Sequence, residues 1–270
     1  MEKASGNLLR IRPENTASSS ATKRCPDCEA EITPIYIPLT GKWFMPVCEC
    51  KIAQYRQEEA ERIQRDRRAR IDRLFKNSGL GPRFINCTFS SWEERKGTEY
   101  AYLVAVEYAK NIDKNIQEGR GFLLFGQPGN GKSHLAAAVV NKALNRGYTA
   151  IFERVPKLLA KIRSTYNEGS SITEEEIMST LTQADLLVLD DAGAEKWTQW
   201  TEPTLYTIVD ERYSHNKALI ITTNSSLEEL EEKIGERAMD RIIEMCEIVE
   251  NRGFSYRKAL AEKKSKGCAL

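Results

Sequence analysis

From Gly121 onward, short apolar runs alternate with longer amphipathic segments. Each run has the length of one strand and is almost uniformly apolar, as expected of strands that are covered on both faces. Between the runs, Thr173 with Glu176 and Ser226 with Glu229 have capping-box spacing, which predicts helix starts. The pattern therefore predicts an α/β fold in which helices flank a parallel five-stranded sheet. The predicted strands are residues 121–126, 149–155, 185–190, 218–223 and 246–251.

The rest of the chain divides into segments of different composition. The N-terminus is polar and rich in Ser and Thr, which predicts disorder. A cysteine-rich stretch follows, and then a long charged run without Gly or Pro, which predicts a largely solvated helix. Gly79, Gly81 and Pro82 mark the boundary after it. The expected domains are a disordered N-terminus (1–24), a four-cysteine domain (25–50), a charged linker helix (51–80), the main α/β domain (81–258) and a basic tail (259–270).

The charge balance limits the kinds of partner. The net charge is +1, from 40 Lys and Arg against 39 Asp and Glu. This balance excludes a protein that coats DNA through bulk positive charge, but it permits a local basic groove. The N-terminus has no apolar core of signal-peptide length, and no stretch approaches the roughly 20 apolar residues that span a bilayer. We therefore expect a soluble, cytoplasmic protein with no membrane partner.

A phosphate-binding motif follows the first predicted strand. The segment GQPGNGKS, which ends in Lys132 and Ser133, matches G-x-x-x-x-G-K-[ST] and precedes a predicted helix. Its glycines let the backbone turn tightly so that N–H groups point at phosphates, and the helix start adds positive charge. Lys132 supplies a full charge, and the Ser133 hydroxyl can ligate Mg²⁺. The expected nucleotide contacts are Gly126, Pro128, Gly129, Asn130, Gly131, Lys132, Ser133 and His134.

Polar side chains at the ends of two later strands complete the predicted site. Asp190 ends the apolar run LLVLD and is the expected acid that organises Mg²⁺. Asp191 is the candidate base for the attacking water. Asn224 ends the next strand, where it can help to position that water, although Asn after a strand is also common turn chemistry.

Five motifs in this order resemble those of a known family. The segments GQPGNGKSHLA, LLVLDDAGAE, IITTN, GERAMDR and SYR look like the AAA+ ATPases of the DnaC/DnaI helicase-loader group, to which the bacterial initiator and the IstB-type transposition ATPases are related. The resemblance covers about residues 80–258. It implies an AAA+ (ASCE) P-loop sheet that binds ATP, with the strand of Asn224 between the P-loop strand and the strand of Asp190.

The resemblance also assigns roles to three arginines. Arg241 matches the arginine finger, which reaches ATP bound by a neighbouring subunit and implies self-association through the ATP site. Arg237 is expected near the nucleotide, and Arg257 resembles the sensor 2 arginine. Arg237 and Arg241 are four positions apart, so they share a helical face, and arginine suits γ-phosphate charge. The alternative is a solvated arginine pair beside Glu236 and Asp240.

The acid that would act as the base departs from the common pattern. Many AAA+ proteins have Glu where this chain has Asp191, whose side chain is one methylene shorter. A shorter base sits farther from the water, so we expect slow hydrolysis that DNA or a partner stimulates. ATP binding without meaningful hydrolysis, as in a nucleotide-gated adaptor, is the alternative.

The cysteine-rich stretch predicts a metal site. Cys25 and Cys28 form C-x2-C, and Cys48 and Cys50 form C-x-C. Four thiolates suit tetrahedral Zn²⁺, whereas an iron–sulfur cluster or four reduced, unliganded cysteines are alternatives. A region this small buries little apolar surface, so it needs metal to fold. Its apolar residues are candidates for a docking surface or a small core, namely Ile35, Tyr36, Ile37, Trp43 and Phe44.

The partners follow from the resemblance. It implies a loader that self-associates on single-stranded DNA and holds a hexameric replicative helicase through the zinc domain. Lys157, Lys161 and Arg163 offer phosphate contacts and Tyr166 a stacking face, although such a charge run is more often a solvated face. Trp197 and Trp200 are further stacking candidates. The alternative is an IstB-like ATPase that recruits a transposase to duplex DNA.

Overall fold

The computed structural model describes residues 16–17, 21–194 and 198–267. The chain divides into two compact units, Met1–Arg65 and Asp66–Leu270. Helix α1, Glu49–Leu74, contains the boundary between them. Trp197 and the beginning of the chain up to residue 15 lie outside the described residues.

The first unit is built from very short antiparallel strands. β1 (Thr16–Ala17), β5 (Lys42–Phe44) and β4 (Ile35–Ile37) form one sheet in that order. β2 (Lys23–Arg24) pairs with β3 (Glu31–Ile32). Two of these strands lie in the segment that was expected to be disordered, because each finds a hydrogen-bonding partner beside the cysteines. The Tyr36 and Trp43 rings face each other across β4 and β5, with centroids 5.2 Å apart.

The second unit contains the predicted parallel sheet. Its strand order is β10-β6-β9-β8-β7, and every pairing is parallel. This confirms that the strand ending in Thr223, just before Asn224, lies between the P-loop strand and the strand of Asp190. The observed bounds are β6 (Gly121–Phe125), β7 (Ala150–Arg154), β8 (Leu186–Ala192), β9 (Ala218–Thr223) and β10 (Cys246–Glu250).

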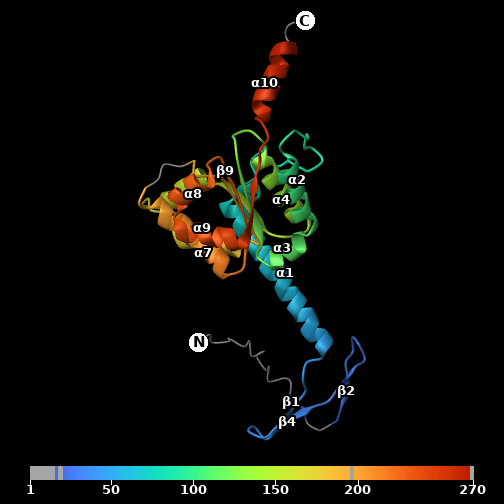
Figure 1. The fold of residues 1–270 in the computed structure, drawn as a ribbon. Helices are drawn as coiled ribbons and strands as arrows, with labels where there is room; N and C mark the ends of the chain where they lie inside the picture. The colour runs from blue at the N-terminus through green and yellow to red at the C-terminus, as the bar shows by residue number, and fades with distance from the viewer. Residues whose placement is uncertain (1–15, 18–20, 195–197, 268–270) are drawn as a thin grey trace. The chain divides into compact units, whose positions relative to one another are not determined.

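Helices cover both faces of this sheet (Figure 1). On one face α2 (Glu99–Lys110), α3 (Ile112–Gln117) and α4 (Lys132–Asn145) pack, after the short 3-10 helix at Lys76–Gly79. The other face carries α5 (Val155–Ser164), α6 (Glu174–Gln183), α7 (Thr201–Ser214), α8 (Leu227–Ile234) and α9 (Glu236–Met245). The last helix, α10, is Tyr256–Gly267. Among the described residues, no helix is long and apolar enough to cross a bilayer.

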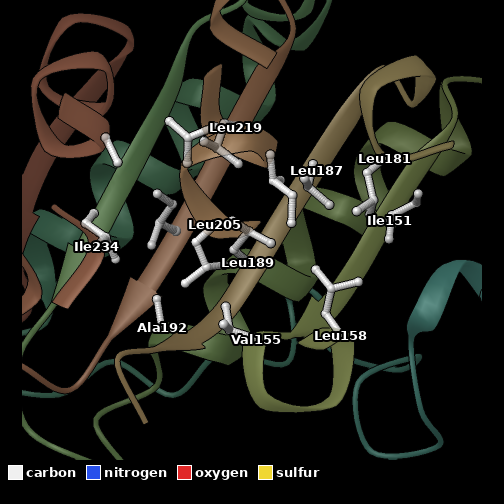
Figure 2. Packing of buried hydrophobic residues seen from close by; sticks show 14 of the residues in the cluster. Ile151, Val155, Leu158, Leu181, Leu187, Leu189, Ala192, Leu205, Leu219 and Ile234 are labelled. Atoms are coloured by element: carbon white, nitrogen blue, oxygen red, sulfur yellow. The ribbon is translucent and has the colours of Figure 1, made fainter. Parts of the chain in front are cut away.

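The alternation of side chains along the strands builds two cores. In β9, Ala218 and Ile220 face the α4 side, whereas Leu219 and Ile221 face the α7 side. Successive strand residues point to opposite faces, so uniformly apolar strands supply both cores at once. Figure 2 shows part of the α7-side core, to which Leu205 of α7 and Leu189 and Leu219 of the sheet belong. Every side chain of β9 is buried, which explains why its run contains no charged residue.

Arg212 of α7 is fully buried and joins several elements of the second unit. Its Nη1 donates to the carbonyls of Leu181 (2.5 Å) and Ala184 (2.8 Å), at the end of α6. Its Nη2 donates to the carbonyls of Asp185 (3.3 Å) and Ala218 (2.5 Å), at the starts of β8 and β9. Burial lowers the pKa of Arg212 to about 9, while the neighbouring Asp185 carboxylate opposes this shift. One guanidinium therefore satisfies carbonyls that would otherwise be buried without partners.

We predict that Arg212→Met destabilises the protein by about 2–4 kcal/mol, because each buried carbonyl left unpaired costs roughly 1–3 kcal/mol while removing a buried charge offsets part of this. The measurement is the urea midpoint, with an unchanged denaturant slope. Arg146→Met is the matched control, since Arg146 is exposed and makes a surface pair with Asp113. Equal midpoints for both variants would contradict the role of Arg212.

Candidate functional site

The P-loop between β6 and α4 has the backbone that its glycines predict. Gly126, Gly129 and Gly131 have φ of 136°, 82° and 102°, a region that residues with side chains rarely adopt. A Cβ on Gly126 would lie 2.3 Å from the Asn251 carbonyl oxygen, so a side chain there has no room. The loop thus turns tightly into the N-terminus of α4, which presents unpaired N–H groups and positive charge.

Lys132 opens α4 and is held by oxygens of the loop. Its Nζ donates to the carbonyls of Gly126 (2.8 Å) and Gln127 (2.9 Å) and to Asn130 Oδ1 (3.1 Å). A fourth bond, to Asn224 Oδ1 (2.9 Å), comes from the end of β9. Burial lowers the pKa of Lys132 to about 8, although the nearby aspartates act in the opposite direction. The ammonium is therefore positioned before any phosphate arrives.

Asp190 lies at the same edge of the sheet and is fully buried. Burial raises its pKa, whereas hydrogen bonds from Ser133 and Thr222 lower it; the Thr222 hydroxyl donates to Oδ1 at 2.7 Å. Within the described residues, Oδ2 has no hydrogen-bond partner. A buried carboxylate oxygen without a donor fits a cation. Ser133 and Asp190 are thus suitable residues to hold Mg²⁺.

Asp191 follows at an irregularity in β8. The register of β8 with β9 shifts between Leu189 and Ala192, and Asp191 has φ of 57°. This shift extends the strand two residues beyond its predicted end and turns Asp191 toward the cleft. The Asn224 amide donates to Asp191 Oδ1 at 3.0 Å. Asn224 therefore bridges Lys132 and Asp191 through the two ends of one side chain.

Most of these groups line a cleft of about 430 Å³; Gly126 and the buried Asp190 are not among its lining residues. Its walls include all predicted nucleotide contacts from Pro128 to His134, together with Asp191, Asn224 and Arg257. Positive charge on Arg257 lowers the pKa of Lys132, which places this arginine electrostatically close to the P-loop. His134 points to the loop that precedes α2, with Nε2 2.9 Å from the Thr88 carbonyl oxygen.

Sequence reasoning missed a second group of cleft residues, in the loop before α2. The guanidinium of Arg95 lies between the rings of Trp92 and Tyr256, 5.1 and 5.0 Å from their centroids. It also donates to the carbonyl oxygens of Asn130 (2.9 Å) and Phe254 (3.2 Å). Through these two hydrogen bonds, Arg95 connects the P-loop to the segment that leads to Arg257. No pattern in the sequence pairs positions this far apart.

Arg154, the last residue of β7, was also missed. Its Nε lies 3.6 Å from Asp190 Oδ2 and 3.8 Å from Asp191 Oδ2. The only signal in the sequence is a polar residue at the end of an apolar run, and the neighbour of that run becomes known only from the sheet order.

The remaining predicted arginines lie on α9, which packs against α7. Arg241 Nε is 2.6 Å from Asp210 Oδ1, and its guanidinium lies over the Tyr206 and Tyr213 rings at 5.1 and 5.5 Å. Arg237 is exposed, and its carbonyl accepts a bond from Arg241 Nη1 at 3.1 Å. Neither arginine lines the cleft of its own chain. Arg237 and Arg241 therefore lie away from Lys132 of their own chain. This placement is compatible both with an arginine finger that reaches a neighbouring subunit and with a solvated arginine pair.

The four cysteines of the first unit converge. Their sulfur atoms all lie within 4.8 Å of one another, and three pairs are 3.5 Å apart. A tetrahedral Zn²⁺ with Zn–S bonds of about 2.3 Å needs sulfurs about 3.8 Å apart, so the group fits this ion. Backbone N–H groups of Asp27 and Cys28 lower the pKa of Cys25 to about 7, which favours the thiolate that binds metal. The metal-ligand group found in the described residues is Cys25, Cys28, Cys48 and Cys50.

Two of the candidate DNA-contacting residues, Lys157 and Lys161, are bound to groups of their own chain. Lys157 Nζ is 2.9 Å from Glu153 Oε1, and Lys161 donates to the Leu74 carbonyl. Arg163 instead lies over the Trp200 ring, 4.8 Å from its centroid. Trp200 Nε1 donates to the hydroxyl of Tyr166 at 3.2 Å, and Tyr166 is 54% exposed. The structure therefore leaves an exposed aromatic–arginine cluster rather than a row of lysines.

Comparison with known proteins agrees with this geometry. The replicative helicase loader DnaC of Escherichia coli (strain K12) is 35% identical over 183 residues, which cover 67% of this chain and 73% of that protein. The crystal structure of the DnaC helicase loader has a TM-score of 0.57 at 27% identity, covering 64% of this chain and 100% of the other. A structure of the replication initiator DnaA bound to AMPPCP and single-stranded DNA has a TM-score of 0.56 at 24% identity over 69% of this chain and 56% of its own, which supports the fold alone.

A family assignment extends over most of the chain. Residues 59–265 match the IstB-like ATP binding proteins. This range contains the P-loop, both aspartates, Asn224 and all three predicted arginines. The structural neighbours confirm the expected AAA+ fold. The chain therefore belongs to the family of IstB-like ATP binding proteins.

Proposed function

We propose that this protein is an ATPase that loads a replicative helicase onto single-stranded DNA. The observation that carries the proposal is the convergence of Lys132, Asp191 and Asn224 on one cleft, in a chain of an ATP-binding family that is 35% identical to a helicase loader. An IstB-like helper that recruits a transposase, and an adaptor that binds ATP without hydrolysing it, share this cleft and are separated by the experiments below.

The arrangement of the cleft supports nucleotide hydrolysis. The P-loop N–H groups and Lys132 would bind the β- and γ-phosphates, and Ser133 and Asp190 would hold Mg²⁺. Magnesium, when bound, neutralises charge that develops on the phosphate oxygens. Asp191 orients the attacking water and accepts its proton, while the amide of Asn224 fixes the Asp191 carboxylate. The short side chain of Asp191 makes this step slow.

We predict that Lys132→Ala weakens ATP binding by about 10–100-fold, because a charge-assisted contact to phosphate is worth roughly 1.5–3 kcal/mol. Asp191→Asn should keep ATP affinity within about threefold and reduce phosphate release by about 10²-fold or more. Titration calorimetry and a phosphate-release assay give these values. Lys142→Ala, exposed on the same helix, is the control.

Two outcomes would contradict this assignment. If Lys132→Ala binds ATP as tightly as the wild type, the phosphate site is wrong. If the wild-type protein binds ATP but releases no phosphate with DNA and helicase present, it is the nucleotide-gated adaptor.

The four-cysteine group supports a zinc-dependent docking unit. Its strands contain at most three residues each, so hydrogen bonds and apolar burial alone stabilise little. Four thiolates on Zn²⁺ supply the missing free energy of folding. Ile35, Tyr36 and Leu39 are exposed at 58%, 47% and 98%, which leaves apolar surface for the helicase.

We predict one Zn²⁺ per chain, lost in Cys28→Ser and retained in Cys87→Ser, as measured by elemental analysis. Cys87 lies in the second unit, outside the sulfur cluster, and is therefore a matched control. Immobilised wild-type protein should capture a hexameric replicative helicase, and Cys28→Ser should not. Capture of a transposase instead of the helicase would favour the IstB-like alternative.

The aromatic–arginine cluster supports contact with single-stranded DNA. Arg163 offers a positive charge and Tyr166 an exposed ring, while the partly buried Trp200 contacts both. Bases stack on such rings regardless of sequence, and arginine pairs with phosphate. This cluster replaces Lys157 and Lys161 as the proposed contact, because those lysines are bound to groups of the same chain.

Self-association through the ATP site is the role that we propose for Arg241. Since Arg241 is paired with Asp210 in its own chain, reaching a neighbour's phosphate requires exchange of a carboxylate for a phosphate, two anions that bind guanidinium in the same way. This exchange would couple the self-association of subunits to the binding of ATP.

We predict that Arg241→Ala reduces DNA-stimulated phosphate release by at least about tenfold while ATP affinity stays within about threefold, because the finger acts on the neighbour. Mixing Arg241→Ala with Lys132→Ala subunits should restore part of the rate, since one kind of mixed interface has both residues intact. Arg252→Ala, which is exposed and paired with Glu250, is the control. No recovery on mixing would exclude action between subunits.

A further inference from the structure

Arg154 places a positive charge against both acids of the candidate site. Parallel pairing aligns Arg154 of β7 with Asp190 of β8, so the two residues lie side by side at the strand ends. The Nε atom of Arg154 is 3.6 Å from Asp190 Oδ2 and 3.8 Å from Asp191 Oδ2. One guanidinium thus lies close to two carboxylates that are adjacent in sequence, at the register irregularity of β8.

Among the described residues, the other groups of the site leave Asp190 Oδ2 to Arg154, although Ser133 and Thr222 donate hydrogen bonds to Asp190 and Lys132 interacts electrostatically with both aspartates. Lys132 Nζ is bound to four oxygens, none of which belongs to an aspartate. Thr222 donates to Oδ1 of Asp190, not to Oδ2. Within the described residues, Asp190 Oδ2 is buried and lacks any hydrogen bond, so Arg154 is the cation that offsets its charge. Burying a carboxylate without such an offset costs several kcal/mol.

A Mg²⁺ ion and Arg154 would compete for the same oxygen. Two cations on one carboxylate oxygen repel each other strongly where water is excluded. The Arg154 side chain has room to move away from Asp190, because it is 47% exposed and borders the cleft. Its guanidinium also lies 6.0 Å from the Phe84 ring centroid, at the wall of the same cleft. It can therefore leave Asp190 without unfolding β7.

We propose that Arg154 is a charge-exchange residue: it pairs with Asp190 and Asp191 until Mg²⁺ with nucleotide displaces it. Arg154 then turns toward the cleft, where the triphosphate offers it new anionic partners. This inference rests on the proposed function, because it requires Mg²⁺–ATP at Asp190. It makes Arg154 a positioning residue that sets how strongly ATP binding depends on magnesium.

The first test compares ATP dissociation constants measured with excess Mg²⁺ and with EDTA. In Arg154→Gln the ratio of the EDTA value to the Mg²⁺ value should rise by about tenfold, because magnesium no longer competes with a cation. Arg154→Lys keeps the charge, so its ratio should stay within about threefold of the wild type. Arg257→Gln removes another positive charge from the cleft, and it should weaken ATP binding under both conditions with little change in the ratio.

The outcomes separate this inference from the proposed function. A wild-type protein that binds no ATP overturns both. If the wild type binds Mg²⁺–ATP but Arg154→Gln leaves the ratio unchanged, Arg154 is an ordinary phosphate contact. An equal rise in Arg257→Gln would mean that total charge, and not the pair with Asp190, sets the magnesium dependence. Either result overturns the inference alone.

The second test needs neither nucleotide nor activity. In EDTA, Arg154→Gln leaves Asp190 unpaired, and its melting temperature should fall by about 2–4 °C, the shift expected for roughly 1 kcal/mol in a domain of this size. Adding Asp190→Asn removes the uncompensated charge and should restore the loss. A double variant that melts no higher than Arg154→Gln would show that Arg154 does not offset the charge of Asp190.

Discussion

Parallel pairing of β6, β9 and β8 is the constraint on which the candidate site depends. The carboxyl ends of these strands meet at one edge of the sheet, so the P-loop, Asn224 and Asp191 become neighbours although the chain separates them widely. Asn224 occupies the middle strand end and contacts both sides, through Lys132 and through Asp191. A different strand order would leave the same residues far apart. Ligand sites of open α/β sheets lie at such strand ends for this reason.

Charge balance is the second constraint. Two aspartates and the ammonium of Lys132 share a small, partly buried space, where unpaired charge is costly. The Lys132 ammonium is hydrogen-bonded to loop carbonyls and side-chain amide oxygens, whereas the ion-pair partner of the two aspartates is Arg154. The site is therefore compensated by the chain itself, and any cation or phosphate that enters must replace a contact that already exists. Arg241 of α9 is likewise paired with a carboxylate of its own chain, that of Asp210 on α7. Both arginines are thus held by carboxylates of their own chain.

The two units achieve stability by different means. The second unit buries mostly apolar strands between two helix layers, and Arg212 satisfies carbonyls that this packing encloses. The first unit has strands too short to form such a core, and its cysteines take that place. Four converging ligands need little chain length, which fits a small unit whose apolar residues Ile35, Tyr36 and Leu39 are exposed.

The local pattern of apolar residues and short motifs was sufficient to predict the strands of the sheet and several helix starts. The strand in ALIITT was predicted with its exact bounds and the other strands within two residues, because burial on both faces demands uniformly apolar runs. The P-loop, the cysteine pairs and the capping box at Ser226 were also visible, since each depends on residues close in sequence. Strand order came from the family resemblance. Only the tertiary structure decided that Arg154 faces Asp190, that Arg95 lies between Trp92 and Tyr256, and that Lys157 and Lys161 are engaged. Those contacts join residues on different elements, and side-chain direction across a sheet or between layers follows from packing, which no local pattern encodes.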